Sequence, residues 1–287
     1  MNGIVIIDKP ADWTSQDVVS KLRGVLHTKR IGHGGTLDPM ATGVLPVFVG
    51  RATRGVEFFE HAEKTYEAVL QLGITTDTED MTGTVLEERP VEVSLAALEA
   101  VLEQFRGEIQ QIPPMYSAIK IGGQKLVDLA RKGKTVERKP RTVTIHALEC
   151  LEFSGNTARL RVRCSKGTYI RTLCKDIGAA LGCGGCMASL RRVAAGTYTI
   201  DEAVPLAQLV QSSDPEVFLR PVDTMFTQYP AVTLTEKQTL RCRNGNSFSV
   251  DMAAGTYRAY DADGEFLMLA KVDEGIMSTI KSFFSVE

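Results

Sequence analysis

The sequence has no hydrophobic run long enough to cross a membrane. Its 287 residues contain no apolar stretch that approaches the ~20 residues of a membrane-spanning helix. The first apolar run, Gly3 to Ile7, is short, and Asp8 and Lys9 follow it directly. A secretory signal peptide has a longer apolar segment and a small-residue cleavage site. We therefore predict a cytoplasmic protein that does not associate with membranes.

The sequence also lacks complete motifs for metal, nucleotide or acyl-serine chemistry. Cys183 and Cys186 form a lone C-x-x-C, and the four histidines are scattered, so a structural zinc would lack ligands. Lys166-Gly167-Thr168 has no upstream glycine of a phosphate loop. Ser117 and Lys120 fit an S-x-x-K pattern whose companion motifs are missing. We expect no metal and no ATP, and six reduced cysteines.

Charge of one sign is not in excess, but it is unevenly distributed. The formal net charge is −2, which by itself does not indicate a nucleic-acid ligand. Residues 57–103 hold twelve acidic and two basic residues, 120–141 hold eight basic and two acidic, and 159–175 hold six basic and none acidic. On charge alone, a solvated surface is the simpler interpretation. A concentrated Lys and Arg face is also what a phosphate backbone requires.

Hydrophobic periodicity predicts an α+β protein. Strands are expected at 3–7 and 66–72, and helices are expected after caps at Thr14 or Ser15 and at Ser94. A further helix over 168–181 would end at Gly182. Residues 32–46 predict an ordered loop. The helix after Ser94 is expected to bury Leu95, Leu98, Val101, Leu102 and Phe105.

Composition divides the chain into two domains. Residues 1–222 would form the larger domain, with a mobile basic insertion at about 111–141 that holds a short helix near 125–132. Three prolines and little pattern between 212 and 230 place a linker at 223–230. Residues 231–287 show short alternating runs around the turn Asp263-Gly264, which predicts a small β domain.

The segment Gly32 to Gly43, GHGGTLDPMATG, holds the strongest candidate for chemistry. Pro39 biases Asp38 toward an extended backbone, and four glycines allow other groups to approach closely. A carboxylate on such a loop can serve as a nucleophile or a general base. In an arbitrary loop, an aspartate more often hydrogen-bonds its own turn. The loop as a whole favours a functional role.

A second candidate region follows an alternating strand. Residues 158–165 predict one packed face and one cationic face of Arg159, Arg161 and Arg163. The turn from Ser165 to Arg171, which includes Lys166, lies where this strand ends and a helix begins, and backbone N–H groups there favour anions. Tyr66, on its own strand, would by itself be assigned to the core.

Five motifs in order along the chain resemble the TruB family of tRNA pseudouridine synthases. They are Lys9 to Ser15 (KPADWTS), Gly32 to Gly43, Lys64 to Tyr66 with Leu72 to Asp80, Ser165 to Arg171, and Leu190 to Arg192. Together, at this spacing, they are far more specific than any one alone. Val127 departs from the pattern, since relatives often carry tyrosine there, and this bears on insertion packing or RNA contact rather than on the reaction.

The resemblance implies a fold, a reaction and a substrate. The fold would be the pseudouridine synthase fold, a mixed, largely antiparallel sheet flanked by helices, with a PUA-like RNA-binding β domain at 231–287. The substrate would be the uridine at position 55 in the T loop of tRNA, bound through the T arm. The reaction breaks the N1–C1′ bond, turns the base and joins C5 to C1′. No metal, organic cofactor or obligatory protein partner would be needed.

The resemblance also assigns catalytic roles. Asp38 would be the reacting carboxylate, and Arg171 would be its ion-pair partner, holding it ionised and aimed. Tyr66 would stack on the uracil and help to remove the C5 proton. The residues do not distinguish attack at the ribose, attack at the base, or an elimination route.

Other residues would bind the RNA. Tyr169 and Leu190 would line the pocket, and His33 would occupy the space that flipped bases leave. The basic insertion would close over the T arm. Further candidate RNA contacts are Arg159, Arg161, Arg163 and Lys166.

Three alternatives stay open at this point. A non-catalytic RNA-binding or tRNA-folding protein would keep the basic face without needing Asp38. A relative that works inside a guide-RNA complex would usually carry extra basic tails. An acyl-serine hydrolase is supported only by Ser117 and Lys120.

Overall fold

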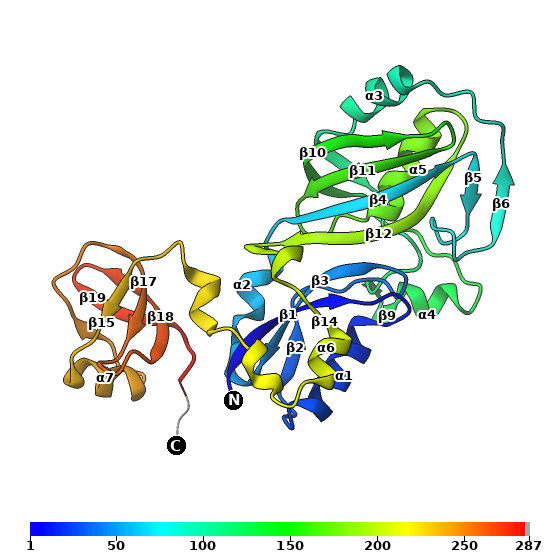
Figure 1. Cartoon of the computed structure of the whole chain (residues 1–287). Helices are drawn as coiled ribbons and strands as arrows, with labels where there is room; N and C mark the ends of the chain where they lie inside the picture. The colour runs from blue at the N-terminus through cyan, green and yellow to red at the C-terminus, as the bar shows by residue number, and fades with distance from the viewer. Residues whose placement is uncertain (285–287) are drawn as a thin grey trace.

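A ten-stranded mixed sheet runs through the larger part of the computed structural model, which describes residues 1–284 (Figure 1). Its strands are β1 (Gly3–Lys9), β2 (Ile31–His33), β3 (Thr42–Val49), β4 (Lys64–Leu72), β7 (Gly107–Gln111), β10 (Arg141–Phe153), β11 (Thr157–Cys164), β12 (Gly185–Ala195), β13 (Tyr198–Thr199) and β14 (Val204–Pro205). Their order is β14-β1-β3-β12-β4-β11-β10-β7, with β2 beside β3 and β13 beside β12. Within this sheet, as described for residues 1–284, only β1–β14 and β3–β12 pair in parallel. The prediction of a mixed, largely antiparallel sheet is confirmed.

Helices cover both halves of this sheet. They are α1 (Ser15–Val25), α2 (Val56–Glu60), α3 (Leu95–Glu103), α5 (Ile170–Ala180) and α6 (Leu206–Gln211), with 3-10 turns η1 (Gly50–Gly55), η2 (Ile200–Glu202), η3 (Pro215–Phe218) and η4 (Val222–Phe226). In one half of the sheet, α1 contacts β2 and α6 contacts β1 and β14. In the other half, α3 packs against β10, and α5 packs against β4 and β12. Among residues 1–284 no helix has the length and apolarity to cross a membrane.

The capping predictions are confirmed, with one error in the helix that follows Ser94. Thr14 caps α1 through a reciprocal bond with Asp17, and Ser94 caps α3. Leu98 is fully buried as expected, but Leu95 is 50% exposed, so its predicted inward position is wrong. Leu95 is the first residue of α3, where the helix has only begun to turn onto the core.

The predicted loop at 32–46 is shorter than expected. Gly32 and His33 belong to β2, and β3 begins at Thr42, so only residues 34–41 lie between the strands. The sequence did not predict the start of β3, because Gly43 and Pro46 interrupt the apolar run at 44–49 and are typical of loops. The loop is therefore held at both ends by neighbouring strands, which fixes the position of Asp38.

The two halves of the sheet meet where β3 and β12 pair over only two residue pairs, Thr42 with Arg191 and Gly43 with Arg192. Gly43 has a φ of 100°, and a Cβ there would lie 2.1 Å from the carbonyl oxygen of Arg192. Only glycine combines this backbone conformation with such a close approach. This contact fixes the distance between the loop that carries Asp38 and strand β12.

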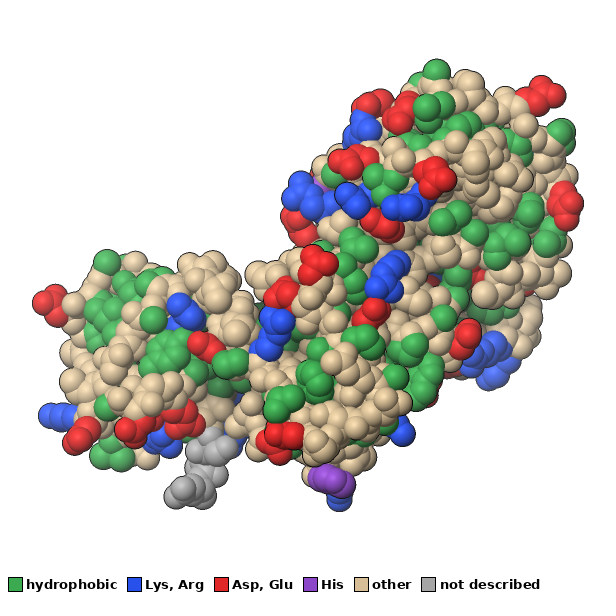
Figure 2. All heavy atoms as spheres, viewed as in Figure 1, with side chains coloured by type: hydrophobic (Ala, Val, Ile, Leu, Met, Phe, Trp, Pro, Cys, Tyr) green, Lys and Arg blue, Asp and Glu red, His purple; other side chains and the backbone are tan. Residues whose placement is uncertain are grey.

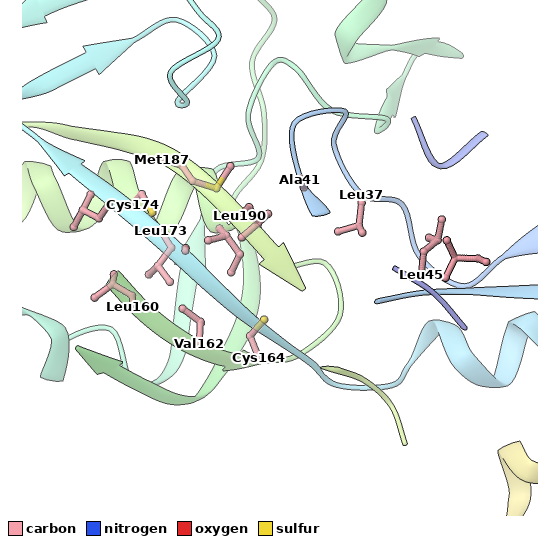
Figure 3. Packing of buried hydrophobic residues seen from close by; sticks show 14 of the residues in the cluster. Leu37, Ala41, Leu45, Leu160, Val162, Cys164, Leu173, Cys174, Met187 and Leu190 are labelled. Carbon is pink, nitrogen blue, oxygen red and sulfur yellow. The ribbon is translucent and has the colours of Figure 1, made fainter. Parts of the chain in front are cut away.

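A single hydrophobic cluster crosses this junction (Figure 3). Leu37, Ala41 and Leu45 approach it from the β3 side, and Leu190 and Leu173 approach it from β12 and α5. All five are at least nine-tenths buried. The inner side of the loop that carries Asp38 is therefore packed into the hydrophobic core.

We expect Gly43→Ala to lower the free energy of unfolding by about 3 kcal/mol, because the new methyl group overlaps a backbone oxygen and the positive φ adds strain. Gly155→Ala is the matched control. Gly155 also has a positive φ, 75°, but no atom of the described chain lies within 4 Å of its added Cβ. Urea unfolding of both variants measures the difference. Equal losses would show that the β3–β12 contact contributes nothing beyond backbone strain.

The insertion carries a hairpin and a short helix. β8 (Lys120–Ile121) pairs with β9 (Gln124–Lys125), and α4 (Leu126–Ala130) follows, as predicted near 125–132. Leu126 and Leu129 are buried, so the helix has its own apolar contacts. A second hairpin outside the main sheet consists of β5 (Ile74–Thr76) and β6 (Val85–Glu88). The mobility of the insertion stays a prediction.

The C-terminal part is a small β domain at one end of the molecule (Figure 1). It contains β15 (Ala231–Thr233), α7 (Glu236–Arg243), β16 (Phe248–Ser249), β17 (Gly255–Tyr260), β18 (Phe266–Asp273) and β19 (Ile276–Ser282), in the sheet order β15-β17-β18-β19-β16. The hairpin at Asp263-Gly264 is confirmed. Within the segment predicted as a linker, Phe226 lies 6.1 Å from Phe266 and 5.7 Å from Phe283 between ring centroids, so this segment is packed.

Candidate active site

A cavity of about 350 Å³ lies beside the β3–β12 junction. Six of the predicted site residues line it: Asp38, Tyr66, Lys166, Tyr169, Arg171 and Leu190. They come from the loop before β3, from β4, from the turn after β11, from the start of α5 and from β12. Its volume is at the lower end of ligand pockets, roughly 300–1,000 Å³, which suits a single base better than a larger ligand.

Arg171 holds the catalytic candidate Asp38 in a fixed geometry. Its side chain is only 6% exposed, and its Nε lies 3.0 Å from Asp38 Oδ2. Its Nη1 donates to the Thr78 carbonyl at 3.2 Å and lies 3.7 Å from Asp80 Oδ2, while Nη2 donates to the Tyr116 carbonyl at 2.8 Å. Because these partners surround the guanidinium, Arg171 cannot turn away without leaving buried acceptors unpaired.

The pKa of Asp38 is set by opposing effects. Burial raises the pKa of this carboxyl above its ordinary value, and the Arg171 guanidinium lowers it, while Asp80 raises it further. The net direction is upward, so the predicted ion pair exists but does not outweigh burial. A carboxylate with a raised pKa is more basic, which favours proton transfer or attack.

This direction predicts the acid limb of the pH profile. If Asp38 reacts as a carboxylate, protonation inactivates it, and kcat/KM falls as the pH drops through its raised pKa. We expect the midpoint above the ordinary value of 3.8. The measurement is tritium release from C5-labelled RNA across a pH series, with RNA affinity and circular dichroism at the same pH values as controls. A midpoint at or below 3.8, with fold and binding intact, would contradict this assignment.

Tyr66 faces the cavity from β4, where it pairs with Val162 on one side and Arg192 on the other. Burial raises the pKa of its phenol, and the positive charge of Arg192 only partly opposes this. The phenol therefore keeps its proton at neutral pH. This state favours stacking of the ring on a base over action as a resting phenolate base.

The backbone of Tyr169 is fixed by a residue that the sequence did not reveal. Gln111, which is 1% exposed, accepts from Tyr169 N–H at 3.0 Å and donates to the Tyr169 carbonyl at 3.2 Å. Tyr169 is the N-cap residue of α5, next to Arg171 in the cavity wall. The only sequence signal for Gln111 was its position at the start of the insertion.

Two buried cations, Lys9 and Arg192, support the loop and were also not assigned from the sequence. Lys9 Nζ donates to the carbonyls of Pro10, Trp13 and Pro39, at 2.8, 2.5 and 3.1 Å. Arg192 donates to the Val44 carbonyl at 2.7 Å and the Gly35 carbonyl at 3.1 Å. Lys9 ends the apolar strand β1, and Arg192 lies within β12. A cation in such a position is a sequence signal that could have identified each of them.

His33 lies outside the cavity, in β2 opposite Val47. Burial lowers the pKa of His33, and the charge of Arg192 lowers it further, so the ring is neutral at neutral pH. Its Nδ1 is buried and has no hydrogen-bond partner within residues 1–284. The structure therefore does not place His33 in the cavity lining, but His33 precedes the lining residue Gly35 by two positions.

The arginines of β11 lie on the other face of the sheet from Tyr66, because they alternate with Val162, which pairs with Tyr66. Arg161 lies 2.7 Å from Glu67, Arg159 lies 3.6 Å from Glu67, and Arg163 lies 3.4 Å from Glu63. Figure 2 shows basic and acidic side chains interspersed over this part of the surface. Their role in RNA binding stays a prediction, and each of the three is paired with a carboxylate.

Comparison with solved structures shows the fold. The chain matches a chain of the "Crystal Structure of a Cbf5-Nop10-Gar1 Complex" with a TM-score of 0.74 and 26% identity, over 98% of this chain and 85% of that one. It matches a chain of the "Structure of H/ACA RNP bound to a substrate RNA containing 2'-deoxyuridine" with a TM-score of 0.73 and 24% identity, over 99% and 85%. Both matches extend over the C-terminal β domain, which is PUA-like. The larger domain has the pseudouridine synthase fold.

Sequence comparisons give the family. Residues 23–170 match the model of the TruB family pseudouridylate synthase (N terminal domain), and residues 171–227 match the tRNA pseudouridylate synthase B C-terminal domain. The tRNA pseudouridine synthase B of Pseudomonas fluorescens (strain Pf0-1) is 46% identical over 96% of this chain and 92% of its own length. That of Dechloromonas aromatica (strain RCB) is 44% identical over 96% and 93%.

The fold and the site thus define an RNA-modifying isomerase of the pseudouridine synthase class. The identities and the matched models narrow this class further. The chain belongs to the TruB family of tRNA pseudouridine synthases, which isomerise uridine to pseudouridine. The resemblance inferred from the five motifs is confirmed.

Proposed function

We propose that this enzyme isomerises the uridine at position 55 in the T loop of tRNA, and that Asp38 is the reacting carboxylate. The observation that carries the proposal is the position of Asp38 in the wall of a base-sized cavity, 3.0 Å from the buried Arg171. The curated relatives named tRNA pseudouridine synthase B, at 44–46% identity, support the substrate. We also propose a cytoplasmic enzyme that works without a cofactor or an obligatory protein partner.

Access to the cavity requires the base to leave the folded loop of the RNA. A base inside a stacked loop cannot reach a carboxylate in a protein pocket, and enzymes that act on bases take them out of the stack. Leu190 and the protonated Tyr66 would then hold the uracil between apolar and aromatic surfaces. His33 is neutral and half-buried next to the loop, which suits the proposed insertion into the space that the base leaves.

The chemistry needs one carboxylate and no electron acceptor. The N1–C1′ bond breaks, the C5–C1′ bond forms, C5 loses its proton, and N1 gains one. Asp38 can form a covalent bond during this exchange or remove a sugar proton, and both routes need it ionised. The supporting observation is the fixed ion pair with Arg171, which keeps the carboxylate directed into the cavity.

We also propose that residues 1–222 form the catalytic domain, 223–230 a packed linker and 231–287 an RNA-binding domain. The buried Phe226 between the two parts supports a fixed relative position. Under this division, the β domain extends the RNA-binding surface beyond the cavity rather than contributing to the reaction.

Tritium release from an unmodified tRNA transcript labelled at uridine C5 tests the proposal, with no cofactor added. Release of about one equivalent per tRNA is expected, because a single uridine exchanges its C5 hydrogen. A transcript with cytidine at position 55, labelled at the remaining uridines, is the control and should release nothing. Release from both transcripts would disprove the T-loop site, and no release with intact binding would favour a non-catalytic RNA-binding protein.

A further inference from the structure

The cavity carries more positive charge than its carboxylates balance. Its lining contains four cations, Lys64, Lys166, Arg171 and Arg192, and two carboxylates, Asp38 and Glu60. Arg171 is paired with Asp38 and Asp80. In the described part of the chain, the other three make no salt bridge to any carboxylate within 4.0 Å. Glu60 is exposed and lies in none of these salt bridges, so two carboxylates face four cations. The part of the lining formed by Lys64, Lys166 and Arg192, called here the cationic end, therefore keeps an excess of positive charge.

Lys64 is the least expected of these cations, because it is only 8% exposed. It is the first residue of β4, and since strand side chains alternate, it shares the cavity face with Tyr66. Its Nζ donates to the Ala62 carbonyl at 2.6 Å and the Glu60 carbonyl at 3.3 Å, and it lies 5.8 Å from the centroid of the Phe59 ring. An ammonium has three N–H donors, and two of them reach backbone acceptors here.

Lys64 and Arg192 flank the loop that carries Asp38. A Cβ added to Gly35 would lie 3.5 Å from Arg192 Nη1 and 3.9 Å from Lys64 Cε. Gly35 precedes Asp38 by three residues, so both cations approach the same loop from the side of the cavity. A nucleotide whose base reached Asp38 would place its sugar and phosphates near this cationic end.

The turn before α5 completes the cationic end. Lys166 Nζ lies 2.9 Å from His61 Nδ1, and among the described residues it forms no salt bridge with a carboxylate. Gly167 follows with a φ of 78° and no described atom within 4 Å of an added Cβ, so the surface beside Lys166 is open. Ser165 and Thr168 also line the cavity here.

A purely structural role for Lys64, as a tie for the turn between α2 and β4, accounts for its two carbonyl contacts but not for its charge. A neutral donor would serve the same turn without the cost of burying an ammonium. Burial lowers the pKa of Lys64 to about 8, so the side chain remains largely cationic at neutral pH. Glu60 opposes this shift from the same cavity but forms no salt bridge with Lys64. A buried cation that lacks a salt bridge is stabilised when a ligand supplies the negative charge.

We propose that Lys64 and Lys166 form a subsite for a backbone phosphate that flanks the uridine bound in the cavity. The inference rests on the proposed function, since it assumes that the base enters beside Asp38. Lys64 would donate its remaining N–H to the phosphate from within the cavity, and Lys166 would approach the same group from the open turn. The subsite would thus position the nucleotide through its backbone while Tyr66 and Leu190 hold its base.

The salt dependence of RNA binding tests the subsite. The probe is a T-arm RNA hairpin, bound to the full-length enzyme and followed by fluorescence anisotropy over a salt series. Removing one phosphate contact should reduce the slope of log K against log salt by about 0.7 to 0.9. Lys64→Met should show this reduction and a loss of affinity of roughly tenfold at moderate salt. Lys64→Arg should keep the slope, and Lys21→Met, on α1 outside the cavity, should leave it unchanged.

A substrate variant keeps the test valid if Lys64→Met fails to fold. Hairpins with a neutral methylphosphonate on the 5′ or the 3′ side of the target uridine remove one phosphate charge at a time. One of the two should weaken binding by wild type and reduce its salt slope. Where Lys64→Met is folded, the same hairpin should cause no further loss.

The outcomes separate this inference from the proposed function. If neither methylphosphonate changes the slope for wild type, while wild type still releases tritium from the T loop, the subsite is wrong and the proposed function stands. An affinity loss in folded Lys64→Met with an unchanged slope would also overturn it, in favour of a contact to an uncharged acceptor. Absence of tritium release from wild type would instead remove the proposed function itself.

Discussion

Replacing Asp38 with asparagine is expected to reduce pseudouridine formation by at least about a thousandfold, the range seen when an essential catalytic group is removed. Asparagine has nearly the same shape and can still accept a hydrogen bond from Arg171 Nε, which lies 3.0 Å from the carboxylate in the native enzyme. An amide, however, can neither form the ester-like bond of a nucleophilic route nor accept a sugar proton. Single-turnover tritium release from C5-labelled tRNA measures the loss.

The control for this variant is Asp12→Asn. Asp12 is exposed and does not line the cavity of about 350 Å³, although it borders a neighbouring cavity that Asp38 and Arg171 also line. It has a φ of 64°, which asparagine also tolerates, so the same chemical change occurs there without backbone strain. Asp12→Asn should retain most activity, and both variants should bind tRNA with nearly wild-type affinity. Turnover by Asp38→Asn within tenfold of wild type would show that Asp38 is not the reacting group.

Much of the loop that carries Asp38 could be inferred from the sequence because its signals are local. Glycine spacing and Pro39 marked an ordered loop around Asp38, and the alternation along β4 marked a half-buried strand at Tyr66. Capping residues gave the starts of α1 and α3. These features depend on residues within a few positions of one another, and their physical causes operate at that range.

The features that were missed depend on long-range pairing. The alternation along β11 predicted a free cationic face of three arginines. In the structure they pair with Glu67 of the neighbouring strand β4 and with Glu63, which directly precedes β4. The two-pair junction between β3 and β12 joins residues almost 150 positions apart. No local pattern indicates which strands are neighbours in the sheet. The salt bridges of the β11 arginines, and the lack of one at Lys64 among the described residues, could therefore not be predicted before the sheet order was known.

The order of the sheet also explains why charge in sequence was a poor guide to charge in space. Residues 57–103 and 159–175 carry opposite charge, and β4 and β11, which they contain, are neighbours. Their charges therefore cancel across one face. The insertion has no such neighbour, because its hairpin β8–β9 lies outside the main sheet. Its eight basic residues therefore offer more unpaired positive charge to a phosphate backbone than the arginines of β11 do.

Replacing Arg171 with methionine is expected to lower the free energy of unfolding by about 3 to 5 kcal/mol, the usual cost of removing one partner from a buried ion pair. Methionine has a similar length but no donor. The Thr78 and Tyr116 carbonyls and the carboxylates of Asp38 and Asp80 would lose their shared partner. Arg161→Met is the control, because the Arg161 side chain is 47% exposed and the loss of its pair with Glu67 should cost less than about 1 kcal/mol. Urea unfolding of both variants gives the comparison.

Arg171→Met should also change the chemistry in a direction that a purely structural residue would not. The guanidinium opposes the effect of burial on Asp38, so its removal should raise the pKa of Asp38 further. If the active form is the carboxylate, as proposed, the acid limb of kcat/KM should move to higher pH, and activity at neutral pH should fall. Arg171→Lys should restore part of this shift because it returns the charge. An acid limb unchanged in folded Arg171→Met would mean that Arg171 supports the fold around Asp38 without setting its ionisation.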